Sequence, residues 1–349
     1  MNKLMYKVGV CGHFGENKTL LNGQTVKTKI LTEELKRELG SEEVQTVDTH
    51  GWKSNPFKLL KKCYSLVKQN ENVIILPAHN GIKVFAPLFL FLNKIFQRKL
   101  HYVVIGGWLP ELLESNSKLR KQICNFDGVY VETQIMAQKL RKLGLNNVRY
   151  LPNFKRLAIL EEKSLVYPKN QPYRLCTFSR VMKEKGIEDA IEAVKFVNTH
   201  LKKEAFVLDI YGQIEDVYEE EFKKLQKTFP EYVKYKGVVD FNQSVDVLKN
   251  YFSLLFPTYY QGEGFAGTIL DAFASGVPVI ATDWKYNSEV IHNNSDGLIY
   301  EVDNATQLRN ILYEIQENPN EFIAMKKNCL KRAEEFLPEK VIKDFVKYL

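Results

Sequence analysis

The sequence has few cysteines, and their arrangement suggests neither pairing nor metal binding. The five cysteines are far apart along the 349 residues and form no CxxC pair, which argues against a disulfide framework and a structural zinc site. No Asp-x-Asp motif occurs, and no group of His, Asp and Glu has metal-ligand spacing. We therefore expect a reducing compartment, no catalytic metal and no bound cofactor.

Long apolar runs are also missing. The most apolar stretch, 84–96, is shorter than the ~20 residues that a membrane-spanning helix needs. No segment near residue 1 has the apolar core of a secretion signal. These features predict a soluble, cytoplasmic protein in which 84–96 is a helix that covers a sheet. A helix that dips into a membrane interface is the alternative for this stretch.

Acidic residues are scarce in the first half of the chain. Residues 1–155 hold 24 Lys and Arg against 12 Asp and Glu, a net charge of +12, whereas 156–349 carry a net charge of −5. A basic half suggests an anionic partner, and a solvated face without a partner is the alternative. No basic motif with interleaved aromatic residues occurs, so nucleic acid is not the expected partner.

Apolar segments alternate with amphipathic ones as in two successive parallel α/β domains. The first half has predicted strands at 6–11, 44–48, 73–77, 101–105, 128–132 and 148–151, with helices at 24–39, 56–69, 84–96, 118–124 and 134–143. The pattern restarts with strands at 173–179, 206–210, 232–236, 253–256 and 277–281 and helices at 186–199, 218–229, 244–250 and 268–275. A proline-containing segment, 152–172, is the predicted linker. The tail is helical from Pro319, and a break at Pro338 precedes a last amphipathic helix.

Loops that follow parallel strands are the first places to search for chemistry, because ligands bind at the carboxyl ends of such strands. The loop after the fourth strand of the second domain contains Gly262, Gly264 and Gly267 and opens into a helix. Glycines let backbone amides approach a ligand, and a helix N-terminus suits a phosphate. Glu263 and Asp271 can accept hydrogen bonds from sugar or ribose hydroxyls. A glycine-rich turn whose acids only cap the helix is the alternative.

A second motif follows the first strand of the second domain, where Arg180 and Lys185 lie on one loop. Arginine offers a planar fork to phosphate oxygens and lysine a compact charge, so the two could neutralise a diphosphate without a metal. A charged surface turn is the alternative. The loop after the first strand of the chain also contains glycines, at positions 12, 15 and 23, but their spacing fits no standard phosphate loop.

Together these motifs resemble retaining glycosyltransferases of family 4, which have the GT-B fold. The resemblance rests on Arg180 with Lys185-Gly186, on Glu263-Gly264-Phe265 with Asp271-Ala272, and on the run 274–281; Asn22-Gly23, Leu151-Pro152-Asn153 and Asp296-Gly297-Leu298 also fit. It implies an α/β protein of two Rossmann-like parallel-sheet domains facing a central cleft. Residues 1–155 would form the acceptor side and 156–337 the nucleotide-sugar-binding domain, and a C-terminal helix, 338–349, would cross back to the first domain.

The resemblance also implies roles. Arg180 and Lys185 would hold the donor diphosphate and stabilise the departing nucleotide, Glu263 would contact the donor sugar, and Asp271 would bind the ribose. The remaining donor-binding positions would be Gly23, Gly212, Val238, Gly264, Phe265, Ala266, Gly267 and Thr268. Transfer would take place on the front face of the sugar, with the leaving diphosphate assisting deprotonation of the acceptor hydroxyl.

The sequence departs from the family pattern in three places. Asp271 stands where the E-x7-E pattern has its second Glu, and Ala266 stands where the family usually has Gly. No histidine occupies the loop after the fourth strand of the first domain. Our acceptor-side candidates are therefore His79, Asn80 and Trp108, although a structural histidine at a strand end is an alternative for His79.

Residues 257–265 and 283–289 look most like bacterial capsular and surface-polysaccharide glycosyltransferases. This resemblance implies a UDP-sugar donor, a glycan or lipid-linked acceptor, and peripheral association of the basic first domain with the anionic inner face of the cell membrane. One alternative is an inactive nucleotide-sugar-binding partner of another glycosyltransferase. Another is a different enzyme on the same fold, such as an epimerase or a phosphorylase.

Overall fold

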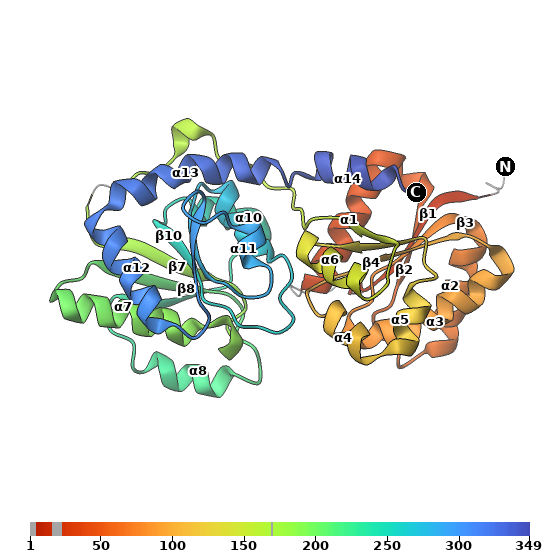
Figure 1. Cartoon of the computed structure of the whole chain (residues 1–349), viewed down its shortest axis with the longest axis horizontal. Coiled ribbons are helices and arrows are strands. Elements are labelled where there is room, and N and C mark those ends of the chain that lie inside the picture. The colour runs from red at the N-terminus through yellow and green to blue at the C-terminus, as the bar shows by residue number, and fades with distance from the viewer. Residues whose placement is uncertain (1–4, 16–22, 169) are drawn as a thin grey trace. The chain divides into compact units, whose positions relative to one another are not determined.

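The computed structural model describes residues 5–15, 23–168 and 170–349. The chain divides into two compact units: unit 1 consists of residues up to Arg156 together with Pro338–Leu349, and unit 2 is Leu157–Leu337. Within the described residues, each unit contains one six-stranded sheet whose strands all pair in parallel (Figure 1). The predicted fold class of two parallel α/β domains is confirmed.

Unit 1 has the strand order β2-β1-β3-β4-β5-β6. Its strands are β1 Tyr6–Gly12, β2 Val44–Asp48, β3 Asn70–Ile75, β4 Lys99–Val103, β5 Gly128–Val131 and β6 Val148–Tyr150. Its helices are α1 Gly23–Leu39, α2 Pro56–Gln69, α3 His79–Phe96, α4 Leu109–Ser115, α5 Ser117–Ile123, α6 Gln134–Lys142 and α14 Pro338–Val346. Most strand positions are buried, as expected for a parallel sheet covered by helices on both faces.

The alternation of side chains along β1 shows which helices cover which face. Val8 and Val10 belong to one apolar cluster with Leu31 of α1 and Phe345 of α14. On the other face, a Cβ added at Gly9 would lie 2.8 Å from the side chain of Leu66 on α2. Because successive strand residues point to opposite faces, α1 and α14 cover one side of the sheet and α2 covers the other.

Unit 2 has the strand order β12-β11-β10-β7-β8-β9. Its strands are β7 Tyr173–Phe178, β8 Phe206–Tyr211, β9 Val233–Gly237, β10 Ser253–Phe256, β11 Val279–Thr282 and β12 Gly297–Tyr300. Its helices are α7 Ile187–Leu201, α8 Glu219–Gln226, α9 Ser244–Leu248, α10 Gly267–Ala274, α11 Asn287–Val290, α12 Ala305–Glu317 and α13 Pro319–Glu334.

Both sheets have a switch point, where the chain changes the direction in which it adds strands. In unit 2 the switch lies between β7 and β10, and in unit 1 between β1 and β3. Loops that leave two such strands diverge to opposite sides and form a crevice at the carboxyl edge of the sheet. The loops after β7 and β10 carry the two strongest motifs of the sequence.

Several elements differ from the prediction. Helix α3 begins at His79 rather than at residue 84, and Pro87 lies inside it without ending it. Helix α4 was not predicted, nor were β12 and α12. No helix in the described part of the chain is both long and apolar enough to cross a bilayer.

Candidate functional site

The loops after β7 and β10 are in direct contact at the switch point of unit 2. The Tyr259 amide donates to the Glu184 carbonyl oxygen at 2.8 Å, and the Thr258 hydroxyl oxygen lies 3.3 Å from the same oxygen. A Cβ added at Gly186 would lie 2.1 Å from the Pro257 carbonyl oxygen, so only glycine permits this close approach. The two loops therefore act as one structural element.

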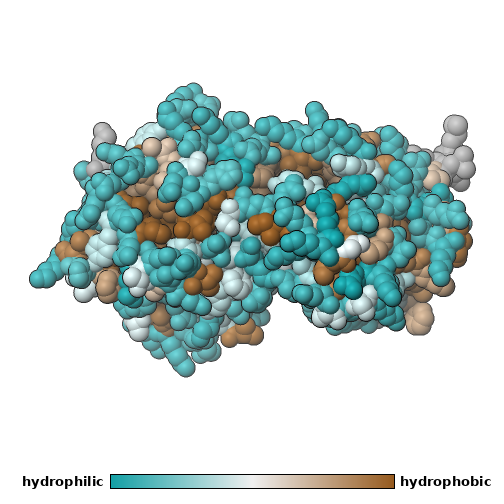
Figure 2. All heavy atoms as spheres, viewed as in Figure 1, coloured by the Kyte–Doolittle hydropathy of each residue, from teal (hydrophilic) through white to brown (hydrophobic). Residues whose placement is uncertain are grey.

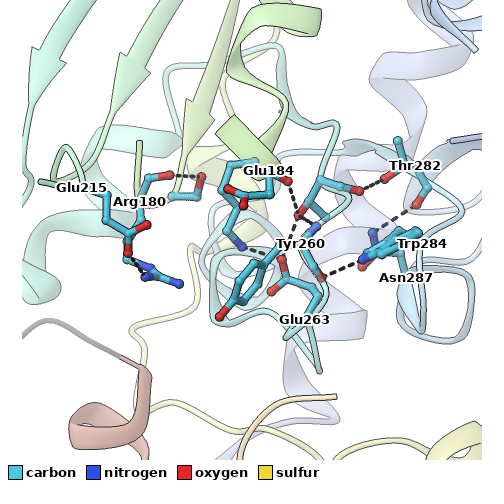
Figure 3. Close-up of polar contacts among 11 residues, drawn as sticks. Arg180, Glu184, Glu215, Tyr260, Glu263, Thr282, Trp284 and Asn287 are labelled. Atoms are coloured by element: carbon cyan, nitrogen blue, oxygen red, sulfur yellow. Dashed lines mark hydrogen bonds and ion pairs between the residues drawn. The ribbon is translucent and has the colours of Figure 1, made fainter. Parts of the chain in front are cut away.

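A buried ion pair links these loops. The Lys185 ammonium is paired with Glu263 Oε2, and each side chain is only 8% exposed (Figure 3). The Thr258 hydroxyl donates a second hydrogen bond to the same carboxylate oxygen at 3.0 Å. Because a buried charge is costly unless it is paired, Lys185 and Glu263 stabilise each other in this position.

Arg180 lies near this pair on the same loop as Lys185. Its guanidinium forms an ion pair with Glu215 and is 39% exposed. The Tyr260 ring lies close to both cations, with its centroid 5.5 Å from the Arg180 guanidinium and 5.3 Å from Lys185 Nζ (Figure 3). Both distances are within the range of cation–π attraction. The structure thus brings together Arg180, Lys185 and Glu263, the three residues expected to be catalytic.

Residues after β11 hold the backbone of the Tyr260 loop from the other side. The Thr282 hydroxyl donates to the Thr258 carbonyl oxygen at 2.5 Å, and Trp284 Nε1 donates to the Tyr260 carbonyl oxygen at 2.7 Å (Figure 3). The Asn287 amide donates to the Thr282 carbonyl oxygen at 3.0 Å. No role was predicted for these side chains from the sequence, although 283–289 belong to the segments that resemble surface-polysaccharide glycosyltransferases.

The N-terminus of α10 follows directly after the loop that carries Glu263. Ala266 is the N-cap and provides no side-chain hydrogen bond, so the first amides of the helix are not capped by it. The Thr268 hydroxyl oxygen is buried and has no hydrogen-bond partner among the described residues. Gly264, Ala266, Gly267 and Thr268 therefore place backbone amides and one hydroxyl where a ligand anion could be bound.

Phe265 differs from the other expected donor-binding residues. Its side chain is 3% exposed, and its ring packs edge-on against Phe336 with centroids 4.8 Å apart. The side chain is therefore part of the apolar core, and only the backbone of Phe265 is suited to contact a ligand.

Asp271 lies one turn into α10 and is 3% exposed. Its Oδ1 accepts a hydrogen bond from the Ser244 hydroxyl at 2.9 Å. Ser244 is the first residue of α9, and the sequence analysis did not single it out. Its position at the start of the predicted helix 244–250 was the only signal in the sequence. Serine is common at helix N-termini, so that position did not indicate a binding site.

Gly212 and Val238 lie at the carboxyl ends of β8 and β9. Gly212 has a φ of 135°, and a Cβ added there would lie 1.7 Å from the Ser179 carbonyl oxygen, in the loop that carries Arg180. The Tyr235 hydroxyl donates to the Gly212 carbonyl oxygen at 2.8 Å. Val238 is 52% exposed, which is unusual for a large apolar residue next to a strand end.

The carboxyl edge of the sheet in unit 1 carries the acceptor-side candidates. His79 is the first residue of α3, and its ring packs edge-on against Trp108 with centroids 5.1 Å apart. Its Nδ1 is 3.2 Å from Asn80 Oδ1. The three candidates thus lie together. Gly23 is the exposed first residue of α1, whereas Asn22 lies outside the described residues.

A histidine pair at this edge was missed by the sequence analysis. His13 follows β1, His50 follows β2, and His50 Nδ1 is 3.2 Å from His13 Nε2. His13 Nδ1 is 2.8 Å from the Thr25 hydroxyl oxygen. Burial lowers the pKa of His13 below its ordinary value, although the nearby Asp48 carboxylate opposes this shift. A histidine two residues beyond the end of each of two predicted strands was the signal that could have indicated the pair.

Comparison with known proteins identifies the family. Residues 161–335, which include the whole of the site in unit 2, match the family described as glycosyl transferases group 1. The chain belongs to this family. The match covers the second unit, where the sequence motifs were most specific.

Two curated relatives show how far the similarity extends. An uncharacterized glycosyltransferase of Methanocaldococcus jannaschii is 24% identical over 186 residues, which cover 52% of this chain and 45% of that protein. The GtfA subunit of a UDP-N-acetylglucosamine–peptide N-acetylglucosaminyltransferase of Streptococcus gordonii is 32% identical over 146 residues, which cover 40% of this chain and 26% of that protein. The aligned part of the chain thus spans less than half of the length of each relative.

Among solved structures, Anabaena Alr3699/HepE in complex with UDP superimposes with a TM-score of 0.76 at 14% identity. The match covers 98% of both chains. The similarity therefore extends over both units and supports the GT-B fold for this chain.

Proposed function

We propose that this protein transfers a sugar from a nucleotide-diphosphate sugar to a hydroxyl group of an acceptor. The observation that carries the proposal is the convergence of Arg180, Lys185 and Glu263 at the switch point of unit 2, beside the N-terminus of α10. Two cations and a row of helix amides suit a diphosphate, and a carboxylate suits sugar hydroxyls. Unit 2 would then bind the donor, and unit 1 would bind the acceptor.

In the proposed reaction, the bond between the sugar C1 and the diphosphate oxygen breaks, and a bond from C1 to the acceptor oxygen forms on the same face. The hydroxyl proton passes to the leaving diphosphate. Arg180 and Lys185 stabilise the negative charge that develops on that group, which is the main catalytic contribution of such sites. This scheme retains the configuration at C1, as in family 4, and requires no metal.

Donor binding must rearrange the charges of the site. The Arg180–Glu215 pair is partly exposed, so exchanging Glu215 for a phosphate costs little. Lys185 and Glu263 are buried, and we expect them to remain in place and contact the diphosphate and the sugar. Asp271, held by Ser244, would bind the ribose.

UDP is the nucleotide that we favour. The Streptococcus gordonii relative is named for a UDP-sugar, and Anabaena Alr3699/HepE was crystallised with UDP. For the acceptor we propose a surface-polysaccharide or lipid-linked glycan at the inner face of the cell membrane. The net charge of +12 over residues 1–155 supports this location, because the acceptor would lie at an anionic surface.

The proposal is tested by transfer assays with a panel of UDP-, GDP- and ADP-sugars, guided by thermal shifts of the protein with each donor. Arg180→Ala should lower turnover by about a hundredfold or more, equivalent to roughly 3 kcal/mol of transition-state stabilisation. Lys183→Ala is the matched control, because Lys183 is an exposed cation of the same loop paired with Glu221. Near-normal transfer by Arg180→Ala would refute the assigned role.

A further inference from the structure

Helices α2 and α3 of unit 1 expose an unusual number of large apolar side chains. Of the large apolar side chains that are exposed in the described part of the chain, six lie on these two helices: Phe57, Leu60, Tyr64, Val84, Phe91 and Ile95. The most exposed are Phe57 at 78%, Ile95 at 65% and Phe91 at 64%. In Figure 2, brown residues reach the surface in the part of unit 1 where Figure 1 places these helices. Exposed apolar side chains gathered on neighbouring helices in this way are typical of an interaction site.

The spacing of these residues produces one stripe on each helix. On α2 the exposed residues are three and four positions apart, and on α3 they are seven and four positions apart, so each set lies on one face of its helix. The Tyr64 and Phe96 rings pack edge-on with centroids 5.3 Å apart, so the stripe of α2 contacts α3 next to Ile95. We call this surface the α2–α3 face.

The charged residues of α2 and α3 are all basic. Neither helix contains an acidic residue, and the exposed lysines of the two helices are Lys58, Lys61, Lys62, Lys68, Lys83 and Lys94. Between Asp48 and Glu111 the sequence holds nine basic residues and a single acid, Glu71. The α2–α3 face therefore combines exposed apolar side chains with exposed cations and carries no acid of its own.

We propose that the α2–α3 face docks on the surface of an anionic lipid bilayer. Phe57, Phe91 and Ile95 enter the boundary between headgroups and acyl chains, and the lysines contact anionic headgroups. Aromatic and aliphatic side chains flanked by lysines are the composition of helices that lie in such an interface. A protein partner fits less well, because lysine is depleted in protein–protein interfaces.

This assignment rests on the membrane association proposed above and gives it a specific surface, but it does not depend on glycosyl transfer. It also reinterprets the stretch 84–96. The inner side of α3, with Phe85 and Phe89, is buried, while the outer side faces solvent. In this proposal α3 covers the sheet with its inner side and enters the membrane interface with its outer side. The two alternatives for this stretch, a sheet-covering helix and an interfacial helix, are therefore compatible.

The test is co-sedimentation of the full chain with vesicles of neutral lipid and with vesicles that also contain anionic lipid. We expect binding to the anionic vesicles only, weakened as salt rises above about 0.1 M, where the Debye length is ~10 Å. Phe91→Ser/Ile95→Ser should abolish binding. Lys61→Glu/Lys62→Glu should weaken it by about 30-fold or more, since each cation near the surface contributes about a factor of five.

The matched control is Lys340→Glu/Lys343→Glu, which makes the same charge change on α14, on the opposite face of the sheet. This variant should bind nearly as the parent chain does. If the control variant lost as much vesicle binding as Lys61→Glu/Lys62→Glu does, the loss would be a general charge effect, and the assignment would be overturned. The assignment would also be overturned if the chain bound neutral and anionic vesicles equally, or if Phe91→Ser/Ile95→Ser left vesicle binding unchanged. Self-association of the parent chain that Phe91→Ser/Ile95→Ser abolishes would overturn it as well.

Sedimentation and transfer are measured separately, so the two proposals fail independently. Vesicle binding needs neither donor nor acceptor. A chain that binds anionic vesicles through the α2–α3 face but transfers no sugar would refute the proposed function alone. A chain that transfers sugar to a soluble acceptor but ignores vesicles would refute the docking surface alone.

Discussion

The Lys185–Glu263 pair allows a double-mutant test of how the site is built. Lys185→Met removes the cation and leaves Glu263 buried without its counter-charge, and Glu263→Gln does the reverse. In the combined variant neither charge remains, and the Thr258 hydroxyl still has an amide oxygen as its acceptor. The comparison therefore separates the cost of an unpaired buried charge from the cost of losing the pair.

The expected losses of unfolding free energy are large enough to show whether the effects of the two substitutions are additive or coupled. Breaking a buried ion pair on one side costs about 3–5 kcal/mol, whereas replacing both partners is often close to neutral. If the two effects added, the combined variant would lose about 6–10 kcal/mol, a large part of the 5–15 kcal/mol that typically stabilises a domain. We expect instead that the combined variant is more stable than either single variant.

The assay is urea unfolding followed by tryptophan fluorescence. The chain has three tryptophans, and Trp284 is the one in unit 2. Substituting Trp52 and Trp108 by phenylalanine leaves Trp284 as the reporter, and its Nε1 hydrogen bond to Tyr260 places it at the site. Transfer activity is measured in parallel with the same substitutions in the chain that keeps all three tryptophans, because Trp108 is an acceptor-side candidate, and it should be lost in all three variants.

An additive loss of stability would refute this reasoning, because it would mean that each side chain is stabilised by its surroundings rather than by the other. Transfer activity in the combined variant near that of the parent chain would contradict the proposed roles of both residues.

Three further outcomes follow from other parts of the molecule. Gly212→Ala should destabilise unit 2 by about 1–3 kcal/mol and weaken UDP binding, because its Cβ would collide with the Ser179 carbonyl oxygen; Gly144→Ala, also at positive φ but in open space, should leave UDP binding unchanged. Burial lowers the pKa of Lys326 to about 8 from 10.5. Between pH 8 and 10.5 the unfolded chain therefore binds more protons than the folded chain, so the free energy of unfolding should rise with pH over this range by up to about 3 kcal/mol. Lys326→Met should remove that rise, which urea titrations from pH 8 to 10 would measure. Phe345→Ala should cost unit 1 about 3–5 kcal/mol and leave the unfolding of unit 2, read from Trp284, unchanged.

The sequence predicts most strands of both sheets because their apolar runs are bounded by polar loops. Strand β12 was missed because only its first and last residues are buried, so its pattern is weak. Helix α4 was missed because it is short and begins beside Pro110, and a proline suggests a loop unless it occupies the first turn.

The candidate site could be predicted where residue type and position in the chain coincide. Arg180, Lys185 and Glu263 are charged residues in loops that follow predicted strands, and parallel strands bring such loops together. The pairing of His13 with His50 depends on distance between separate loops, which no local pattern encodes. The packing of Phe265 against Phe336 is a tertiary contact of the same kind, and it explains why an expected binding residue has its side chain in the core.

Helix α14 has a consequence for the order in which the chain becomes structured. Val341, Ile342 and Phe345 complete the apolar cluster of unit 1, yet they are separated from the rest of that unit by all of unit 2. During synthesis, unit 2 emerges and can fold while α1 still lacks its final covering helix. Until residues 338–349 leave the ribosome, an apolar surface of unit 1 stays uncovered, and we expect nascent chains stalled before this point to be bound by chaperones.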